Sequence, residues 1–248
     1  MIMEICEKCG KPKTYISLLT GKAIPCLCEC EKKRREQEEK RAALTQRLLQ
    51  VAGLRGASLL GNRYSSITFK GTETGNNESF DNAFIRCKKY CDNAREVYEN
   101  GYGIYLYGDR GTGKTHLAAC IVNDLLEQLV PVVFTNLTEI GKIAFNPSTE
   151  FDRICKVDFL VIDDIGAQRV RNKDGDLWLQ EKVYELINTR YNEMLPTIFT
   201  SNYSIGELVT ECGISSRTVD RIAEMSSAVF KLTGASRRIQ GRNGKLPF

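Results

Sequence analysis

The sequence is poor in histidine, with His116 as the single copy among 248 residues. Sites that need several histidine side chains are therefore excluded, and we expect no Ser-His-Asp triad. We expect His116 either to pack against neighbouring side chains or to face solvent. The chain also lacks an apolar run long enough for a membrane helix, an apolar leader core, internal repeats and low-complexity segments. We expect a cytoplasmic protein that has no membrane contact.

Cysteine is abundant by contrast, with ten copies. In a cytoplasmic protein these are metal ligands or buried thiols rather than disulfides. Cys6 and Cys9 form a C-x-x-C knuckle, and the sequence CLCEC at 26–30 supplies three more thiols after a sixteen-residue gap. Four thiolates from these two knuckles make a closed tetrahedral zinc site, without an open position for catalysis. We expect Zn²⁺ on Cys6, Cys9, Cys28 and Cys30, with Cys26 as the alternative to one of the last pair. Unligated thiols or an iron–sulfur cluster are the competing interpretations.

The other cysteines are expected in the core. Cys87 and Cys91 fall within a stretch of helical spacing from Phe80 to Tyr98. The same interpretation covers three isolated residues, Cys120, Cys155 and Cys212.

Composition changes along the chain predict three segments. Residues 1–30 are rich in cysteine, and residues 31–61 begin with the charged run EKKRRE, continue as an amphipathic helix and end near several glycines. Residues 62–248 alternate apolar strands with helical stretches, which predicts an α/β domain with a parallel five-stranded sheet flanked by helices. The expected strands lie at 103–107, 132–135, 157–162, 197–201 and 228–232. We therefore expect a small zinc-binding domain, an exposed helical linker and this α/β domain.

The most informative motif is GDRGTGKT at residues 108–115, which matches the pattern G-x-x-x-x-G-K-[ST]. A predicted strand precedes it, and a helical pattern from Thr115 to Gln128 follows it. This context aims helix N–H groups and the positive end of the helix dipole at phosphates. We expect ATP here, with the Lys114 ammonium on the β- and γ-phosphates and the Thr115 hydroxyl on Mg²⁺. The residues expected to hold the nucleotide are Gly108, Gly111, Thr112, Gly113, Lys114 and Thr115.

Two adjacent acids, Asp163 and Asp164, end the apolar run FLVI. Neighbouring carboxylates repel each other unless a cation is present. We expect Asp163 to hold Mg²⁺ and Asp164 to polarise the attacking water, with a capping pair as the alternative. Asn202 follows the next apolar strand, where its amide can orient the water or contact the γ-phosphate; an ordinary turn residue is the alternative.

Arginines near the C-terminus are candidates for phosphate contacts. Arg217 and Arg221 are spaced i and i+4, which places both on one face of a predicted helix. We expect Arg221, with Arg217 as the fallback, to act as an arginine finger on the γ-phosphate of a neighbouring subunit. A solvated face paired with Asp220 is the alternative. Arg238 is a weaker candidate for a phosphate sensor within its own subunit.

Basic residues are clustered although the net charge is only +4. Residues 231–248 contain five basic residues and no acid, and the sequence RVRNK at 169–173 follows the acid pair. Both stretches can contact nucleic-acid phosphates, and plain solvent exposure is the alternative for each.

Four motifs occur together in an order that is typical of one family. They are GTGKTHLA at 111–118, VIDDIGA at 161–167, NTRY at 188–191 and PTIFTSN at 196–202. In combination they resemble the signatures of bacterial and phage DnaC/DnaI-type helicase loaders, which the transposition helper IstB shares. The resemblance covers roughly residues 63–240.

The resemblance implies an AAA+ ATPase that delivers a DnaB-type hexameric helicase onto single-stranded DNA during DNA replication. It also implies that the protein forms homo-oligomers on ATP binding and that assembly or single-stranded DNA stimulates its ATP hydrolysis. In the family the cysteine-rich end contacts the helicase, and this end is shorter here than in DnaI-like loaders. Lys114 and Thr115 match the family's Walker A motif, and Asp163 and Asp164 match its Walker B motif. Asn202 matches sensor I, and Arg221 matches the arginine finger. Arg190 matches a recurrent arginine without an assigned role.

Three other functions compete with a helicase loader. An IstB-like ATPase that assists DNA transposition has the same chemistry and another client, and the cysteine cluster favours the loader over it. A P-loop kinase would need a second substrate pocket, for which no pattern is evident. A nucleotide switch that binds without hydrolysis is disfavoured by Asp164 and Asn202.

Overall fold

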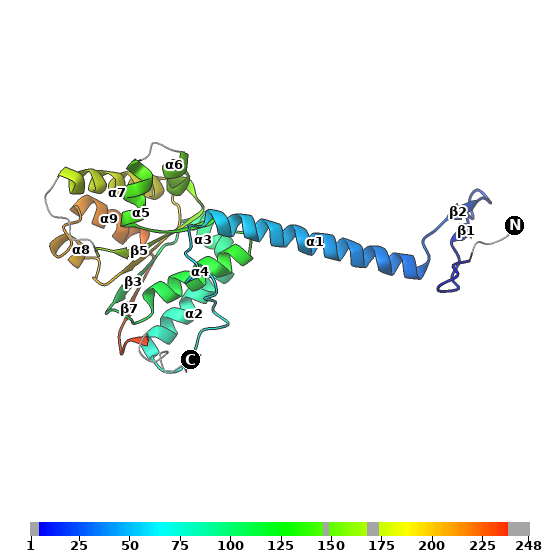
Figure 1. The fold of residues 1–248 in the computed structure, drawn as a ribbon, viewed down its shortest axis with the longest axis horizontal. Coiled ribbons are helices and arrows are strands. Elements are labelled where there is room, and N and C mark those ends of the chain that lie inside the picture. The colour runs from blue at the N-terminus through cyan, green and yellow to red at the C-terminus, as the bar shows by residue number, and fades with distance from the viewer. Residues whose placement is uncertain (1–4, 146–148, 168–173, 238–248) are drawn as a thin grey trace, which may run out of the picture. The chain divides into compact units, whose positions relative to one another are not determined.

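A computed structural model describes residues 5–145, 149–167 and 174–237 of the chain (Figure 1). The chain divides into two compact units, Met1–Ala52 and Gly53–Phe248. Among the described helices, none is both long enough and apolar enough to cross a bilayer. In chain order the elements are β1 (Thr14–Ile16), β2 (Ala23–Pro25), α1 (Glu29–Ala57), α2 (Glu78–Asp92), α3 (Ala94–Asn100), β3 (Ile104–Gly108), α4 (Lys114–Glu127), β4 (Val132–Asn136), α5 (Leu137–Phe145), α6 (Thr149–Lys156), β5 (Phe159–Ile165), α7 (Asp174–Asn192), β6 (Thr197–Ser201), α8 (Glu207–Thr210), α9 (Ser216–Met225) and β7 (Ala228–Leu232).

The N-terminal unit is a hairpin followed by most of a long helix. Strands β1 and β2 pair antiparallel, with Thr14 opposite Pro25. Helix α1 is largely exposed and begins with acidic residues, which favour the positive end of its dipole. Ion pairs one turn apart, such as Arg34 with Glu31 and Glu38, support a helix whose surface is mostly in solvent.

The predicted parallel five-stranded sheet is confirmed, in the order β4-β5-β6-β3-β7. Its inner strands are buried on both faces, which explains their continuous apolar sequences. Strand β6 lies between β3 and β5, so the carboxyl ends of these three strands meet at one edge of the sheet. Such an edge is where open α/β sheets bind ligands.

Two hydrophobic cores cover the two faces of the sheet. Helices α2, α3 and α4 pack on one face, and α5 to α9 pack on the other. The predicted core thiols are confirmed, because all five are buried: Cys87, Cys91, Cys120, Cys155 and Cys212. Burial raises the pKa of Cys120 and of Cys155 to about 11, so both remain neutral thiols.

The helical stretch from Phe80 to Tyr98 is two helices rather than one. Helix α2 begins after Asn77, whose side chain caps it by accepting a hydrogen bond from the Phe80 N–H. It ends at Asn93, where both the backbone N–H and the side-chain amide donate to the carbonyl of Lys89. The side-chain amide therefore competes with the backbone for the same carbonyl, and Asn93 leaves the helical conformation with φ −110° and ψ 29°, a break that hydrophobic spacing alone does not reveal.

Candidate functional site

The phosphate-binding loop joins β3 to α4, the context that its motif requires. Gly108, Gly111 and Gly113 have φ angles of 135°, 85° and 107°, where a side chain is strained. A Cβ added at Gly113 would also lie 2.5 Å from Cε2 of Phe80. The bare backbone of the loop therefore has both the conformation and the space to bring its N–H groups close to an anion.

The side chains of this loop hold its shape. The Lys114 ammonium donates hydrogen bonds to the carbonyl oxygens of Gly108 at 2.7 Å and Asp109 at 2.8 Å. The Thr112 hydroxyl donates to the Asp109 carbonyl at 2.8 Å. Lys114 is buried although it carries a charge, which is unusual for lysine outside a binding site.

The acid pair lies inside β5 rather than at its end. Strand β5 continues to Ile165, and its register with β6 shifts between Ile162 and Ile165, so that Asp163 and Asp164 form a bulge. Asp164 has a φ of 56°, a left-handed conformation that aspartate tolerates better than most residues. The apolar pattern stops at Ile162, which is why the sequence indicated a shorter strand.

Asp163 contacts both β6 and the phosphate-binding loop. The Thr200 hydroxyl donates to Asp163 Oδ1 at 2.6 Å. Burial raises the pKa of Asp163, whereas the hydroxyls of Thr200 and Thr115 lower it by hydrogen bonding. The Thr115 hydroxyl and the Asp163 carboxyl therefore lie together on one side of the sheet. Both are hard oxygen ligands, so the residues present fit a magnesium ion.

Asn202 and Asp164 are brought together at the same edge. Asn202 Nδ2 donates to Asp164 Oδ1 at 3.1 Å. Thr200 accepts a hydrogen bond from the Asp164 N–H at 2.8 Å while it donates to Asp163. Sequence analysis missed this threonine, whose only signal is a hydroxyl two residues before Asn202 in a buried strand.

A cavity of about 420 Å³ lies over these groups, a size typical of cofactor sites. The phosphate-binding loop and the start of α4 line one side, and Asp164 and Asn202 line another. Arg63, Tyr64 and Ile67, which precede α2, also line it. The cavity therefore joins the predicted phosphate and metal groups to a segment that the motifs did not indicate.

Arg237 is a further residue at this cavity that sequence analysis did not single out. Its guanidinium lies 3.9 Å from the ring centroid of Phe80 and donates to the Glu73 carbonyl at 2.7 Å. Its backbone N–H donates to Gly111 in the phosphate-binding loop at 2.9 Å. The predicted sensor Arg238 lies outside the described residues. The basic sequence at 169–173 and the chain from 238 onward also lie outside them.

His116 packs at the rim of the cavity, which is one of its two predicted placements. Its Nε2 lies 2.8 Å from the Thr72 hydroxyl, and its ring is beside Phe80. Burial, with a smaller effect from Arg237, lowers the pKa of His116, so the ring is neutral near pH 7.

The two candidate finger arginines lie on α9, and neither is among the described residues that line the cavity. The Arg221 guanidinium stacks on Tyr184 at 4.9 Å and on Tyr191 at 5.5 Å. It also donates to the Arg217 carbonyl at 3.5 Å, while Arg217 itself is exposed.

Arg190 is completely buried and holds main-chain carbonyls. Its five hydrogen bonds run to the Thr197 hydroxyl and to the carbonyls of Ile154, Cys155, Val157 and Pro196. Burial lowers the pKa of Arg190 to about 9, which leaves it charged at neutral pH. The acceptors lie at the end of α6 and the amino ends of β5 and β6, far along the strands from the acid pair, so its role is structural.

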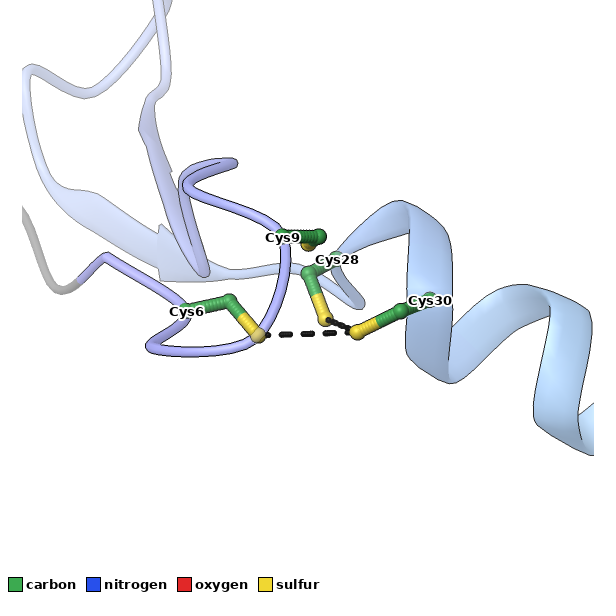
Figure 2. Close-up of side chains that lie close together, drawn as sticks. All are labelled: Cys6, Cys9, Cys28 and Cys30. Carbon is green, nitrogen blue, oxygen red and sulfur yellow. Dashed lines mark hydrogen bonds between the residues drawn. The ribbon is translucent and has the colours of Figure 1, made fainter.

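Four cysteines of the N-terminal unit gather at one point (Figure 2). Cys6 and Cys9 come from a turn before β1, and Cys28 and Cys30 flank the first residue of α1. Their sulfur atoms all lie within 4.8 Å of one another, which fits a tetrahedral ZnS₄ centre whose Zn–S bonds of about 2.3 Å imply S–S separations near 3.8 Å. Cys26 instead directs its sulfur at the Pro12 carbonyl, 3.6 Å away.

The turn between Cys6 and Cys9 favours a thiolate. Backbone N–H groups of Cys9 and Lys8, with smaller effects from neighbouring thiols, lower the pKa of Cys6 to about 6. Anionic sulfur is the form that binds metal, so this turn is suited to start a metal site.

The fold and the loop together define a P-loop nucleotide-binding protein of the AAA+ class. The chain belongs to the family of IstB-like ATP binding proteins, whose family model matches residues 92–244. The predicted family resemblance is thereby confirmed.

Curated relatives include phage and replication proteins. The phage-like element PBSX protein XkdC of Bacillus subtilis is 25% identical over 229 residues, 90% of this chain and 79% of that protein. The replicative helicase loader DnaI of the same organism is 28% identical over 155 residues, so the match covers 56% of this chain but only 48% of DnaI. A crystal structure of DnaI superimposes with a TM-score of 0.59 at 25% identity, covering 73% of this chain and 95% of that one.

Proposed function

We propose that this protein is an ATP-hydrolysing helicase loader that binds a DnaB-type replicative helicase and delivers it to single-stranded DNA in the cytoplasm. One observation carries the proposal: the phosphate-binding loop, Asp164 and Asn202 line one cavity in a chain whose relatives include a named helicase loader.

In the proposed site Lys114 binds the terminal phosphates, and Thr115 and Asp163 hold Mg²⁺. The metal supplies charge neutralisation of the phosphates when it is bound. Asp164 accepts a proton from the attacking water, and its hydrogen bond to Asn202 keeps the carboxylate oriented. Thr200 is a positioning residue, because it fixes the Asp163 carboxyl and the Asp164 backbone at once.

We place Arg221 at the γ-phosphate of a neighbouring subunit, with Arg217 as the fallback. Stacking on Tyr184 and Tyr191 restricts the Arg221 side chain before any partner arrives, which reduces the entropy lost on contact. Hydrolysis would then depend on assembly of several copies, and an isolated protomer would be a slow ATPase.

We assign residues 1–30 to a zinc-binding domain, 31–61 to a helical linker and 62–248 to the ATPase domain. The proposed zinc ligands are Cys6, Cys9, Cys28 and Cys30, and zinc would fold a segment that has little core of its own.

The full-length protein should contain about one zinc ion per chain. Replacing Cys9 with serine should reduce bound zinc to a small fraction of that, because one of four thiolates is lost. Replacing Cys26 with serine is the matched control and should leave zinc unchanged, since its sulfur points at Pro12. Elemental analysis of purified protein measures both. Equal zinc loss in the two variants would contradict the assigned ligand set.

The N-terminal unit also presents an apolar tip that suits contact with another protein. Leu18 and Leu19, in the turn between β1 and β2, are 103% and 97% exposed. The chain from residue 11 to 28 contains three lysines and no acid. An apolar tip within a basic segment fits an apolar pocket with an acidic rim on the partner.

The full-length protein should co-purify with a DnaB-type helicase, and the helicase together with single-stranded DNA should raise its ATPase rate at least tenfold. The double variant Leu18→Asp, Leu19→Asp should lose helicase binding while its unstimulated ATPase rate stays within twofold of wild type. Retention of helicase by the double variant would reject the tip as the contact.

An IstB-like ATPase that assists DNA transposition is the second candidate, and the family match itself favours it. The same experiment separates the two. Capture of a transposase in place of the helicase, with stimulation by that transposase, would replace the loader assignment.

A further inference from the structure

One wall of the nucleotide cavity is a short segment with no helix or strand, residues 63–67, which we call the strap. Arg63, Tyr64 and Ile67 of the strap line the same cavity as Lys114 and Thr115. A triphosphate on the loop occupies the Lys114 side, so the nucleoside end of a bound nucleotide extends toward the remaining walls. Aromatic and aliphatic side chains are the usual partners of a base.

The strap is held by the helix that begins at the phosphate-binding loop. Asn123 of α4 is 1% exposed, and its Nδ2 donates to the carbonyls of Tyr64 and Ile67, each at 2.8 Å. The Tyr64 ring also packs against Phe134 of β4, with centroids 5.6 Å apart. The buried side-chain amide of Asn123 therefore fixes both the Tyr64 and the Ile67 carbonyl of the strap.

The last turn of α1 fixes that amide in turn. Arg55 Nη1 donates to Asn123 Oδ1 at 2.9 Å and to the Ser65 carbonyl at 2.8 Å. Because the amide oxygen faces Arg55, the amide nitrogen must face the strap. Arg55 Nη2 also lies 3.6 Å from Glu127 near the end of α4. Arg55, Asn123 and the strap thus form one continuous hydrogen-bonded network, in which each member restricts the next.

We infer that Arg55 and Asn123 are positioning residues that hold the strap against the nucleoside end of the nucleotide, so that nucleotide affinity depends on the last turn of α1. This inference rests on the proposed function, because it assumes that phosphates occupy the loop. Any partner that displaces the last turn of α1 would weaken nucleotide binding, and by linkage the nucleotide would oppose that displacement to the same degree. The helix that carries Arg55 is the one that begins beside the cysteine cluster.

The test compares ADP with inorganic tripolyphosphate, each with Mg²⁺, by calorimetry on the full-length protein. Arg55→Ala should raise the Kd for ADP about tenfold and leave the Kd for tripolyphosphate within twofold, because tripolyphosphate does not reach the strap. Arg55→Lys, which keeps one donor group, should recover part of the ADP affinity. Arg41→Ala, on an exposed part of the same helix, is the matched control and should bind both as wild type does.

Two results would overturn the inference alone: ADP affinity within twofold of wild type in Arg55→Ala, or equal weakening of ADP and tripolyphosphate. Equal weakening would show that Arg55 acts on the loop or on overall stability. Wild-type protein that binds neither ligand would instead overturn the proposed function and this inference with it. Arg55 is partly exposed, so the variant is expected to fold, and its thermal unfolding midpoint checks this.

Discussion

Replacing Lys114 with alanine should weaken ATP binding at least about 100-fold, a change near 2.7 kcal/mol. The ammonium is buried at the start of α4 and already bonds two carbonyls of the loop. A phosphate chain in this loop would accept charge-assisted hydrogen bonds from the same group, and these are among the stronger ones in proteins. Calorimetric titration of the full-length protein with ATP and Mg²⁺ measures the effect.

The control for Lys114 is Lys142→Ala. Lys142 is an exposed residue of α5 in an ion pair with Glu139, and its removal should leave the Kd for ATP within twofold. ATP affinity within threefold of wild type in Lys114→Ala would refute the loop as the nucleotide site. A thermal unfolding midpoint close to wild type is required of both variants, because Lys114 also supports the loop conformation.

Arg221→Ala provides a contrast with Lys114→Ala, because it should separate binding from turnover. ATP affinity should stay within twofold, while turnover stimulated by helicase and DNA should fall by at least about 100-fold, as expected for an arginine finger. Survival of stimulated turnover in Arg221→Ala, with its loss in Arg217→Ala, would move the finger to Arg217. Stacking on Tyr184 and Tyr191 means that Arg221→Ala also loses some stability, so the comparison is made on the folded protein.

The features that sequence reasoning anticipated are those encoded in local spacing. Continuous apolar runs predicted the five parallel strands, and glycine spacing predicted the strand–loop–helix order around Lys114. The paired cysteine knuckles led to the four thiols that the structure gathers, and Cys26 is separated from them. In each case the residues that form the feature are near one another in the chain, or recur with the spacing of a helix or a strand.

The features that sequence reasoning missed depend on contacts between distant segments. Thr200 contacts Asp163 across two strands, and Arg55 contacts Asn123 across 68 positions. A hydroxyl or an amide that bonds to main-chain carbonyls leaves no pattern in a single sequence, because any carbonyl is an acceptor. The break at Asn93 and the bulge at Asp163 and Asp164 were missed for a related reason: polar hydrogen bonds mark both places, and these leave no sign in the hydrophobic period.

Arg190 shows how such contacts determine whether a residue is structural or catalytic. In the sequence it matched a recurrent arginine of the family without an assigned role. Its guanidinium is enclosed by carbonyls of Ile154, Cys155, Val157 and Pro196. These groups lie where β5 and β6 begin, whereas the acid pair lies near the carboxyl end of β5 and Asn202 directly follows β6.

Replacing Arg190 with alanine should therefore destabilise the fold by about 3–5 kcal/mol, because buried carbonyls lose their donors and a cavity opens. Urea unfolding of the full-length protein measures the free energy change. The matched control is Arg95→Ala, an exposed arginine of α3 paired only one turn away with Glu99, which should cost about 0.5 kcal/mol or less.

A second measurement separates the structural role of Arg190 from a catalytic one. At a temperature where Arg190→Ala remains folded, its Kd for ATP should stay within twofold of wild type, since its described contacts lie at the opposite end of the strands from the site. Arg190→Lys should recover only part of the stability, because an ammonium has three donors and cannot replace the hydrogen bonds that the planar guanidinium makes to five acceptors. A stability change under about 1 kcal/mol in Arg190→Ala, or loss of ATP binding without loss of stability, would contradict the role assigned to this residue.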